Sequence, residues 1–158
     1  MSVDRFAIGS RTYLDANIYI YAFEGIETYR RRIAELLAAI DRQDAVVIAS
    51  ELLFTELLPR PIREGRHDLV ERYMELIQRT PRIHLAPVDR SVILRSVHLR
   101  ANFGLRSIDA LHLATALVHG CDTFVTNDRH VARVDRIRVL TLDDLPRRKS
   151  GSPQEPGG

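Results

Sequence analysis

The sequence predicts an α/β fold in which a central, mostly parallel sheet of five strands is covered by helices on both faces. Short runs with β-strand character alternate along the chain with longer segments whose apolar residues recur every three or four positions. Strands separated by helices pair in parallel through right-handed crossovers, which place the helices over the sheet. The length of 158 residues, of which 45% are hydrophobic, suits one such domain with a full core.

Five strands are expected, each at a short apolar or β-branched run. They span residues 11–15, 45–49, 82–88, 123–126 and 137–142. A first helix is expected to begin near Ile18, and residues 50–58 are expected to form the helix after the second strand. The other helices are indicated by apolar residues at helical spacing: Ile33, Leu36, Leu37 and Ile40; Leu69, Tyr73, Leu76 and Ile77; Ile93, Leu94 and Val97; and Leu111, Leu113 and Leu117.

One domain is expected over residues 1–145, followed by a disordered tail over 146–158 that is basic at first and then rich in Pro and Gly. No stretch approaches the roughly 20 apolar residues of a membrane span, and the first residues show no signal-peptide pattern. The single cysteine, Cys121, excludes an internal disulfide and a Cys-rich zinc site. We therefore expect a cytoplasmic protein that does not enter a membrane.

The charge is mildly basic, with a net charge of +2 and a pI near 9.0. Lys149 is the only lysine among 23 basic residues, so arginine supplies nearly all of the positive charge. The planar guanidinium suits phosphate, although a GC-rich genome produces the same bias. This composition therefore gives weak support for a polyanionic partner.

Acidic residues stand where strands of the predicted sheet end. In parallel sheets the functional site lies beyond the carboxyl ends of the strands, often where the strand order reverses. Asp15 ends the first expected strand, and Asp128 follows the fourth. Glu56 lies on the helix after the second strand, and Asp109 lies on the first turn of the last long helix. The four carboxylates are therefore expected at one rim.

Each acid also has an ordinary structural explanation. The alternatives are capping of the first helix by Asp15 or Asn17, an ion pair of Glu56 with Arg60, a first-turn position of Asp109 behind a Ser107 cap, and capping by Asp128 of a short helix around Val131. Asp109 is the most informative of the four, because Leu113 and Ala116 continue its row on the inward face of the helix. A buried, unpaired carboxylate costs several kcal/mol, so an acid there needs a cation, hydrogen bonds or an open cleft.

Three or four carboxylates at one rim repel one another unless divalent cations neutralise them. Hard oxygen ligands favour Mg²⁺ or Mn²⁺. Such an ion can lower the pKa of a bound water, orient it toward a phosphodiester and neutralise the leaving oxygen. Thr126 and Asn127, next to Asp128, are candidates to position that water or a phosphate oxygen. The pattern therefore predicts metal-dependent phosphodiester hydrolysis without a protein nucleophile.

At these residues the sequence resembles the PIN-domain nucleases, and among them the VapC toxins of bacterial toxin–antitoxin modules. The resemblance covers roughly residues 11 to 145 and follows the order and spacing of the family. The matching segments are Tyr13-Leu14-Asp15-Ala16-Asn17, the segment around Glu56, Ile108-Asp109-Ala110-Leu111-His112-Leu113-Ala114-Thr115-Ala116, and Phe124-Val125-Thr126-Asn127-Asp128.

The resemblance implies a three-layer α/β/α PIN-like sandwich, a homodimer, Mg²⁺- or Mn²⁺-dependent endoribonuclease activity and a VapB-like antitoxin that covers the acidic site. By position it implies an acidic quartet of Asp15, Glu56, Asp109 and Asp128. It further implies that Asp15, Glu56 and Asp109 hold the metal, with Thr126 as a hydroxyl neighbour and Asn17 as a polar accessory. His130 departs from the pattern, since many relatives carry another acid there. Asp128 is thus expected to act through water or not at all.

Basic residues near these motifs have weaker interpretations. His112 and His130 suggest a general base or a zinc ligand, but no cysteine or second histidine stands at zinc-ligand spacing. We therefore expect neither histidine to be catalytic. Arg106 and Arg129 flank the proposed site and could hold RNA phosphates, or they could be solvated surface arginines.

The resulting hypothesis is an endoribonuclease toxin whose substrate is RNA and whose protein partner is an antitoxin. One alternative is a catalytically silent binding module, which the intact quartet argues against. Another is a PIN nuclease outside toxin–antitoxin systems. A third is an α/β phosphatase with an aspartyl nucleophile, but that chemistry usually needs an acid two residues later, where this chain has Asn17.

Overall fold

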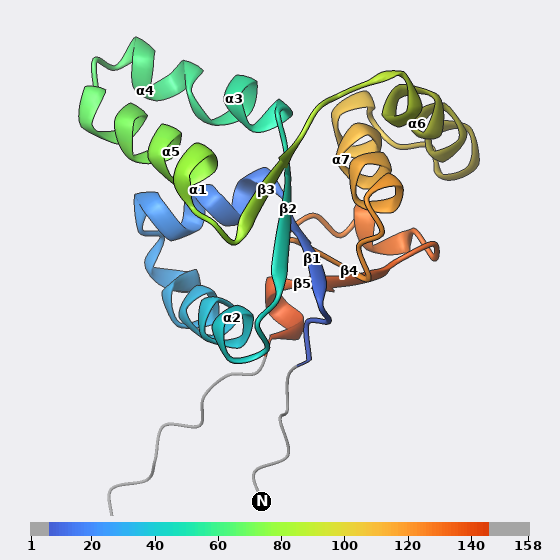
Figure 1. Cartoon of the computed structure of the whole chain (residues 1–158), viewed down its shortest axis with the longest axis horizontal. Coiled ribbons are helices and arrows are strands. Elements are labelled where there is room, and N and C mark those ends of the chain that lie inside the picture. The colour runs from blue at the N-terminus through green and yellow to red at the C-terminus, as the bar shows by residue number, and fades with distance from the viewer. Residues whose placement is uncertain (1–6, 146–158) are drawn as a thin grey trace, which may run out of the picture.

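A single parallel sheet organises the computed structural model, which describes residues 7–145 (Figure 1). Its strand order is β3-β2-β1-β4-β5, and every pair of neighbouring strands is parallel. The strands are β1 (Arg11–Leu14), β2 (Val46–Ser50), β3 (Ile83–Ala86), β4 (Thr123–Thr126) and β5 (Arg138–Thr141). The chain first builds outward from β1 to β3 and then returns to the other side of β1. The strand order therefore reverses between β1 and β4.

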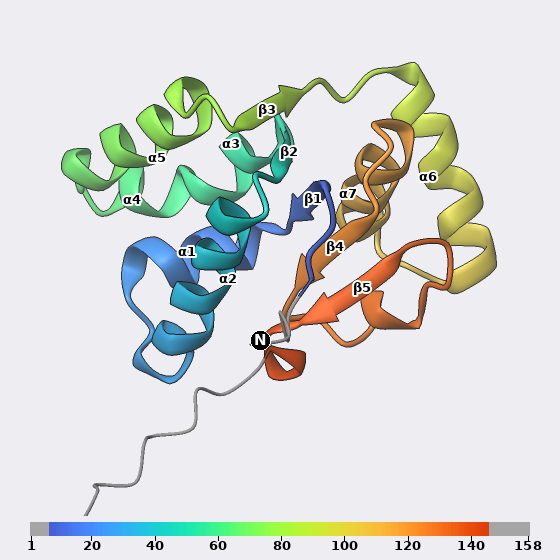
Figure 2. The ribbon, with the colours of Figure 1, turned by 60° about the horizontal axis from the view of Figure 1, so that its bottom comes forward.

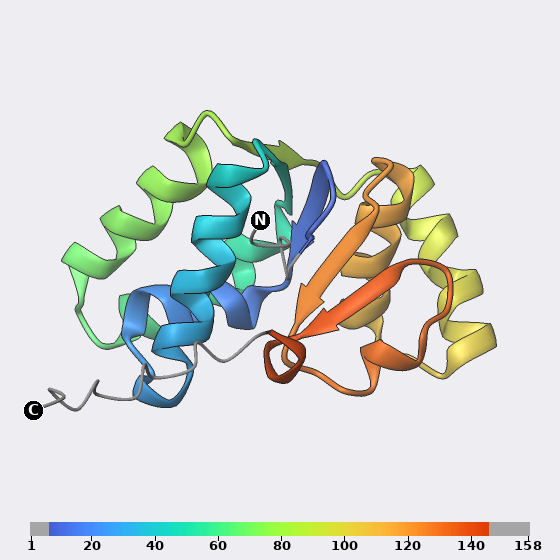
Figure 3. The ribbon, with the colours of Figure 1, turned by 90° about the horizontal axis from the view of Figure 1, so that it is seen from below.

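Helices cover both faces of the sheet, so the predicted three-layer α/β/α architecture is confirmed (Figures 2 and 3). On one side of the sheet lie helices α1 (Ala16–Glu24), α2 (Arg30–Arg42), α3 (Leu52–Leu57), α4 (Pro59–Arg63) and α5 (His67–Arg79), with α4 packed on α3 and α5. The other face packs against α6 (Arg90–Phe103) and α7 (Ser107–Val118). Short 3₁₀ helices span Glu27–Tyr29, Val131–Arg133 and Leu142–Asp144.

Two apolar cores correspond to these two faces. The first contains Leu36 of α2, Leu53 of α3 and Tyr73 of α5. The second contains Leu99 of α6 and Leu113 of α7, packed on the strands. The apolar spacing seen in the sequence points inward in α2, α5 and α7, although Leu37 of α2 is exposed. In α6 the prediction is wrong: Ile93, Leu94 and Val97 are all exposed, and Val92 and Leu99 face the core instead.

The observed elements depart from the expected ones in detail. All five strands are present, but the sheet is wholly rather than mostly parallel. The third strand was expected over 82–88 and ends at Ala86, because Pro87 has no N–H to continue the ladder. The tail expected over 146–158 lies outside the described residues. Among residues 7–145, no helix has the length and apolar content needed to cross a bilayer.

Gly9 lets the chain enter β1 close to the carboxylate of Asp122. That carboxylate accepts hydrogen bonds from the backbone N–H groups of Ser10 (3.0 Å) and Arg11 (3.3 Å). Gly9 has φ +77°, and a Cβ built on it would lie 1.9 Å from Asp122 Oδ1. Any side chain at position 9 would therefore push the carboxylate out of place.

We expect Gly9→Ala to lower the free energy of unfolding by more than Gly65→Ala does. Gly65 has φ +69° and nothing within 4 Å of its Cβ position, so it measures the left-handed backbone cost alone, about 1–2 kcal/mol. Gly9→Ala adds the lost hydrogen bonds, each about 1 kcal/mol. Urea unfolding of the two variants measures the difference. Equal destabilisation would contradict the clash with Asp122.

Candidate active site

Asp15 lies at the carboxyl edge of the sheet, where the strand order reverses. Its backbone N–H donates to the carbonyl oxygen of Val125 on β4 at 2.9 Å, which brings it next to Thr126. Thr126 Oγ1 donates to Asp15 Oδ2 at 2.7 Å, and the Ala16 N–H donates to Oδ1 at 2.8 Å. Asp15 is therefore both the cap of α1 and a residue of the sheet rim, so the two explanations of it are compatible.

The Asp15 carboxylate lies in surroundings that disfavour its charge. Burial raises its pKa most, and the negative charge of Glu56 raises it further. His112 and the hydrogen bonds from Thr126 and Ala16 act in the opposite direction but do not cancel the rise. A carboxylate whose charge is under-compensated in this way is a good ligand for an additional cation.

Glu56 of α3 is held by a buried histidine of α7. His112 Nε2 lies 2.5 Å from Glu56 Oε2 and 3.9 Å from Asp15 Oδ1, and the side chain of His112 is only 1% exposed. Its other ring nitrogen, Nδ1, lies 2.5 Å from the hydroxyl of Tyr13 on β1. The alternative pairing of Glu56 with Arg60 is wrong, because Arg60 contacts Glu24 and Glu64.

The environment of His112 favours its protonated form. Burial by itself would lower its pKa, but the hydrogen bond to Glu56 and the negative charges of Asp15, Glu56 and Asp109 outweigh burial and raise it. A protonated His112 would place positive charge next to two of the four acids.

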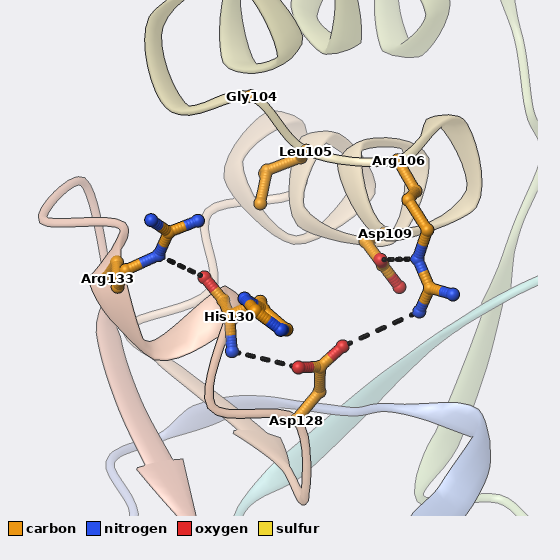
Figure 4. Close-up of a pocket in the computed structure, with 7 residues that line it drawn as sticks. All are labelled: Gly104, Leu105, Arg106, Asp109, Asp128, His130 and Arg133. Carbon is orange, nitrogen blue, oxygen red and sulfur yellow. Dashed lines mark hydrogen bonds and ion pairs between the residues drawn. The ribbon is translucent and has the colours of Figure 1, made fainter.

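Asp109 and Asp128 face each other across the guanidinium of Arg106 (Figure 4). Arg106 Nε donates to Asp109 Oδ2 at 3.0 Å, and its Nη2 lies 3.7 Å from Asp128 Oδ2. Asp128 is also fixed by its backbone, since its N–H donates to Thr126 Oγ1 at 3.0 Å. The hydroxyl of Thr126 thus connects Asp15 with Asp128.

The expected Ser107 cap is wrong, because helix α7 begins at Ser107 itself and the residue before it, Arg106, makes no side-chain cap. Asp109 does stand in the first turn of α7, as its third residue. The expected capping by Asp128 is also wrong. Asp128 Oδ1 accepts from the backbone N–H of His130 at 2.8 Å, but the 3₁₀ helix Val131–Arg133 lacks a side-chain cap.

A cavity of about 490 Å³ opens beside this pair of acids. Its lining residues are Gly104, Leu105, Arg106, Asp109, Asp128, His130 and Arg133. Figure 4 shows the acids with Arg106 on one side and His130 and Arg133 on the other. Negative and positive charge thus meet in one cavity, as a phosphodiester and a cation would require.

Three other expected site residues, Asn17, Asn127 and Arg129, contact residues outside the acidic quartet. Asn17 Oδ1 accepts from the backbone N–H of Asn127 at 3.3 Å, which ties α1 to the loop after β4. The side chain of Asn127 turns away from the acids and donates to the hydroxyls of Tyr21 (3.1 Å) and Tyr29 (3.3 Å). Arg129 contacts Asp143 at 3.3 Å and does not line the cavity.

Three residues of the site were missed or undervalued in the sequence. His112 stands three residues after Asp109, and this spacing on one helix face was a usable signal. Tyr13 looked like an ordinary core residue of a strand. Arg133 follows the last motif, and nothing in its neighbours sets it apart.

The four carboxylates are the kind of ligand that a hard divalent cation prefers. In this structure, however, basic side chains of the protein lie among them. Among residues 7–145, no three His, Cys, Asp or Glu side chains are close enough to hold a metal ion in this arrangement. His112 lies between Asp15 and Glu56, and Arg106 lies between Asp109 and Asp128. A guanidinium already occupies the space between two carboxylates, so that space accepts positive charge. The residues present therefore fit Mg²⁺ or Mn²⁺ in charge and ligand chemistry.

Comparison with known proteins identifies similar sequences and folds. A family model described as the PIN domain matches residues 12–137. No curated protein matches the sequence. A chain of a toxin–antitoxin complex from Klebsiella pneumoniae is 23% identical, with a TM-score of 0.62, over 83% of this chain and 97% of that one.

Two further similar structures are bound to DNA. A chain of VapBC from Salmonella typhimurium is 18% identical, with a TM-score of 0.64, over 85% of this chain and 99% of that one. A chain of VapBC2 from Rickettsia felis, bound to a promoter fragment, is 15% identical, with a TM-score of 0.64, over 83% of this chain and 98% of that one. At these identities the likeness is one of fold.

Proposed function

Since the chain belongs to the PIN domain family, we propose that it is a divalent-metal-dependent endoribonuclease and the toxin of a toxin–antitoxin pair. The observation that carries the proposal is the meeting of Asp15, Glu56, Asp109 and Asp128 at one sheet edge, beside a cavity with an arginine wall. A catalytically silent binding module would not need all four acids.

In this proposal Asp15, Glu56 and Asp109 would hold Mg²⁺ or Mn²⁺, and Asp128 would assist. The chemistry that such an ion supplies when bound is acidification of a water molecule and neutralisation of charge on the phosphodiester. The chain's own residues fix the ligands: Thr126 and the Ala16 N–H orient Asp15, and His112 orients Glu56. Hydrogen bonds of this kind to metal ligands reduce the reorganisation that metal binding requires.

One wall of the cavity is basic and could bind the RNA backbone at a distance from the acids. Arg133 and His130 line the wall opposite Asp109 and Asp128 (Figure 4). A cationic wall offsets the repulsion between the acids and an RNA backbone, and it can hold a phosphate next to the one that is cleaved. RNA affinity should consequently fall as the salt concentration rises.

The proposal includes two protein partners, an antitoxin and a second copy of the chain. The similar solved structures are toxin–antitoxin complexes, which supports a VapB-like antitoxin as the partner of this chain in the cytosol. A homodimer is part of the same proposal. The exposed apolar side chains of Ile93, Leu94 and Val97 on α6 offer a surface that a protein contact would cover.

The function is tested with the purified full chain, free of any antitoxin, and a labelled total RNA. We expect cleavage with Mn²⁺ or Mg²⁺ and none after chelation by EDTA, with activity returning when the metal is restored. Mapping the cut sites would identify the RNA class. A folded protein that cleaves no RNA with either metal would refute the proposal, and metal-independent cleavage would refute the mechanism.

A further inference from the structure

The four acids of the site lie in two pairs, and each pair shares one basic side chain. His112 lies between Asp15 and Glu56, at 3.9 and 2.5 Å. Arg106 lies between Asp109 and Asp128, at 3.0 and 3.7 Å. This arrangement explains how the carboxylates can stand at one rim before any metal ion is bound.

The two basic side chains, His112 and Arg106, differ in how easily they can move away from the acids. The side chain of His112 is 1% exposed and is fixed at both ring nitrogens, by Tyr13 and Glu56. The side chain of Arg106 is 82% exposed, and its side-chain partners in the described part of the chain are the two carboxylates themselves. The carboxylates are 15% and 22% exposed, so the guanidinium is the solvent-exposed member of each pair. Solvent screens its charge and its long side chain gains freedom on release, which weakens such pairs. Arg106 is therefore the displaceable cation of the site.

We infer that Arg106 is a built-in competitor of the metal ion. Its guanidinium holds Asp109 and Asp128 in the metal-free protein and would leave them when a divalent ion binds Asp109. The released guanidinium remains at the mouth of the cavity, where it can bind an RNA phosphate. This inference rests on the proposed function and adds regulation to it: metal binding and substrate binding are coupled through one arginine.

The inference makes two opposite predictions for Arg106→Gln. Mn²⁺ should bind about three- to tenfold more tightly, because the guanidinium that competes with it for Asp109 is gone. This change is on the scale of one or two ion pairs of this kind. RNA should bind more weakly in the presence of metal, and the salt dependence of its binding should decrease by about one phosphate contact.

Arg133→Gln is the matched control, because Arg133 lines the same cavity but donates to the backbone carbonyl of His130 instead of to a carboxylate. It removes the same charge, so any general electrostatic effect on Mn²⁺ affinity should appear in both variants. Only Arg106→Gln should show the larger gain, while RNA affinity should fall in both.

Mn²⁺ affinity is measured without RNA, by isothermal titration calorimetry on wild type, Arg106→Gln, Arg133→Gln and Asp109→Asn. A gain in Mn²⁺ affinity that is larger in Arg106→Gln than in Arg133→Gln supports the inference, and equal gains in the two variants would contradict it. If wild type binds Mn²⁺, Asp109→Asn loses it and Arg106→Gln equals wild type, the inference is wrong while the proposed function stands. If wild type binds no Mn²⁺ at all, both are wrong.

Discussion

Asp109→Asn is expected to lower the rate of metal-dependent RNA cleavage by at least about a thousandfold, with the fold unchanged. The substitution is nearly isosteric and replaces a charged oxygen by an amide. A bound metal contributes several kcal/mol of charge stabilisation to such reactions, and each 1.4 kcal/mol corresponds to about a factor of ten in rate. Single-turnover cleavage of a labelled RNA with Mn²⁺ measures the loss.

Asp68→Asn is the matched control, because Asp68 stands in the first turn of α5 just as Asp109 stands in the first turn of α7. Both changes remove an acid that complements a helix dipole, but only Asp109 faces the cavity. Asp68→Asn should cleave RNA like wild type. Comparable losses in both variants, or activity of Asp109→Asn within tenfold of wild type, would contradict a role of Asp109 in the reaction.

His112→Asn is expected to lower cleavage by about a hundredfold, the upper range for partners that orient metal ligands. Without the imidazole, Glu56 and Asp15 lose the cation between them, and Glu56 loses its 2.5 Å contact. Because Glu56 itself remains, excess Mn²⁺ should restore part of the rate. The measurement is the cleavage rate as a function of Mn²⁺ concentration.

A pair of tyrosines separates the positioning role of His112 from a packing role. Tyr13→Phe removes only the hydroxyl at His112 Nδ1 and should reduce cleavage about tenfold. Tyr19→Phe removes a buried hydroxyl that has no hydrogen-bond partner in the described part of the chain, and it should leave cleavage unchanged. If the two variants behave alike, Tyr13 and His112 do not position Glu56.

The fold could be predicted because its signals are local. Apolar spacing in the helices and short β-branched runs define alternating elements, and alternation in turn requires a parallel sheet. Asp15 and Asp128 could be placed at the site because they follow strands, and parallel strands end at one edge. Strands β1 and β4 are neighbours, and this brings Thr126 to Asp15. Parallel sheets often have a strand order that reverses in this way, but no short segment of the sequence specifies which strands become neighbours.

The missed features depend on side-chain conformations that connect distant segments. Tyr13, His112 and Glu56 come from β1, α7 and α3, and their contacts exist only after these elements pack. Arg106 was interpreted as a phosphate ligand or a solvated surface arginine, since its sequence neighbours do not show that its guanidinium contacts Asp109 and Asp128. Asn127 was expected at the acids, but its amide finds two tyrosine hydroxyls instead.

The central claim is that these acids share a divalent cation, and anomalous diffraction from crystals of the full chain grown with Mn²⁺ tests it most directly. The account predicts a manganese peak contacted by the carboxylates of Asp15 and Asp109, with the guanidinium of Arg106 withdrawn from Asp109. Crystals that contain Mn²⁺ elsewhere while Arg106 still occupies the acids would contradict it.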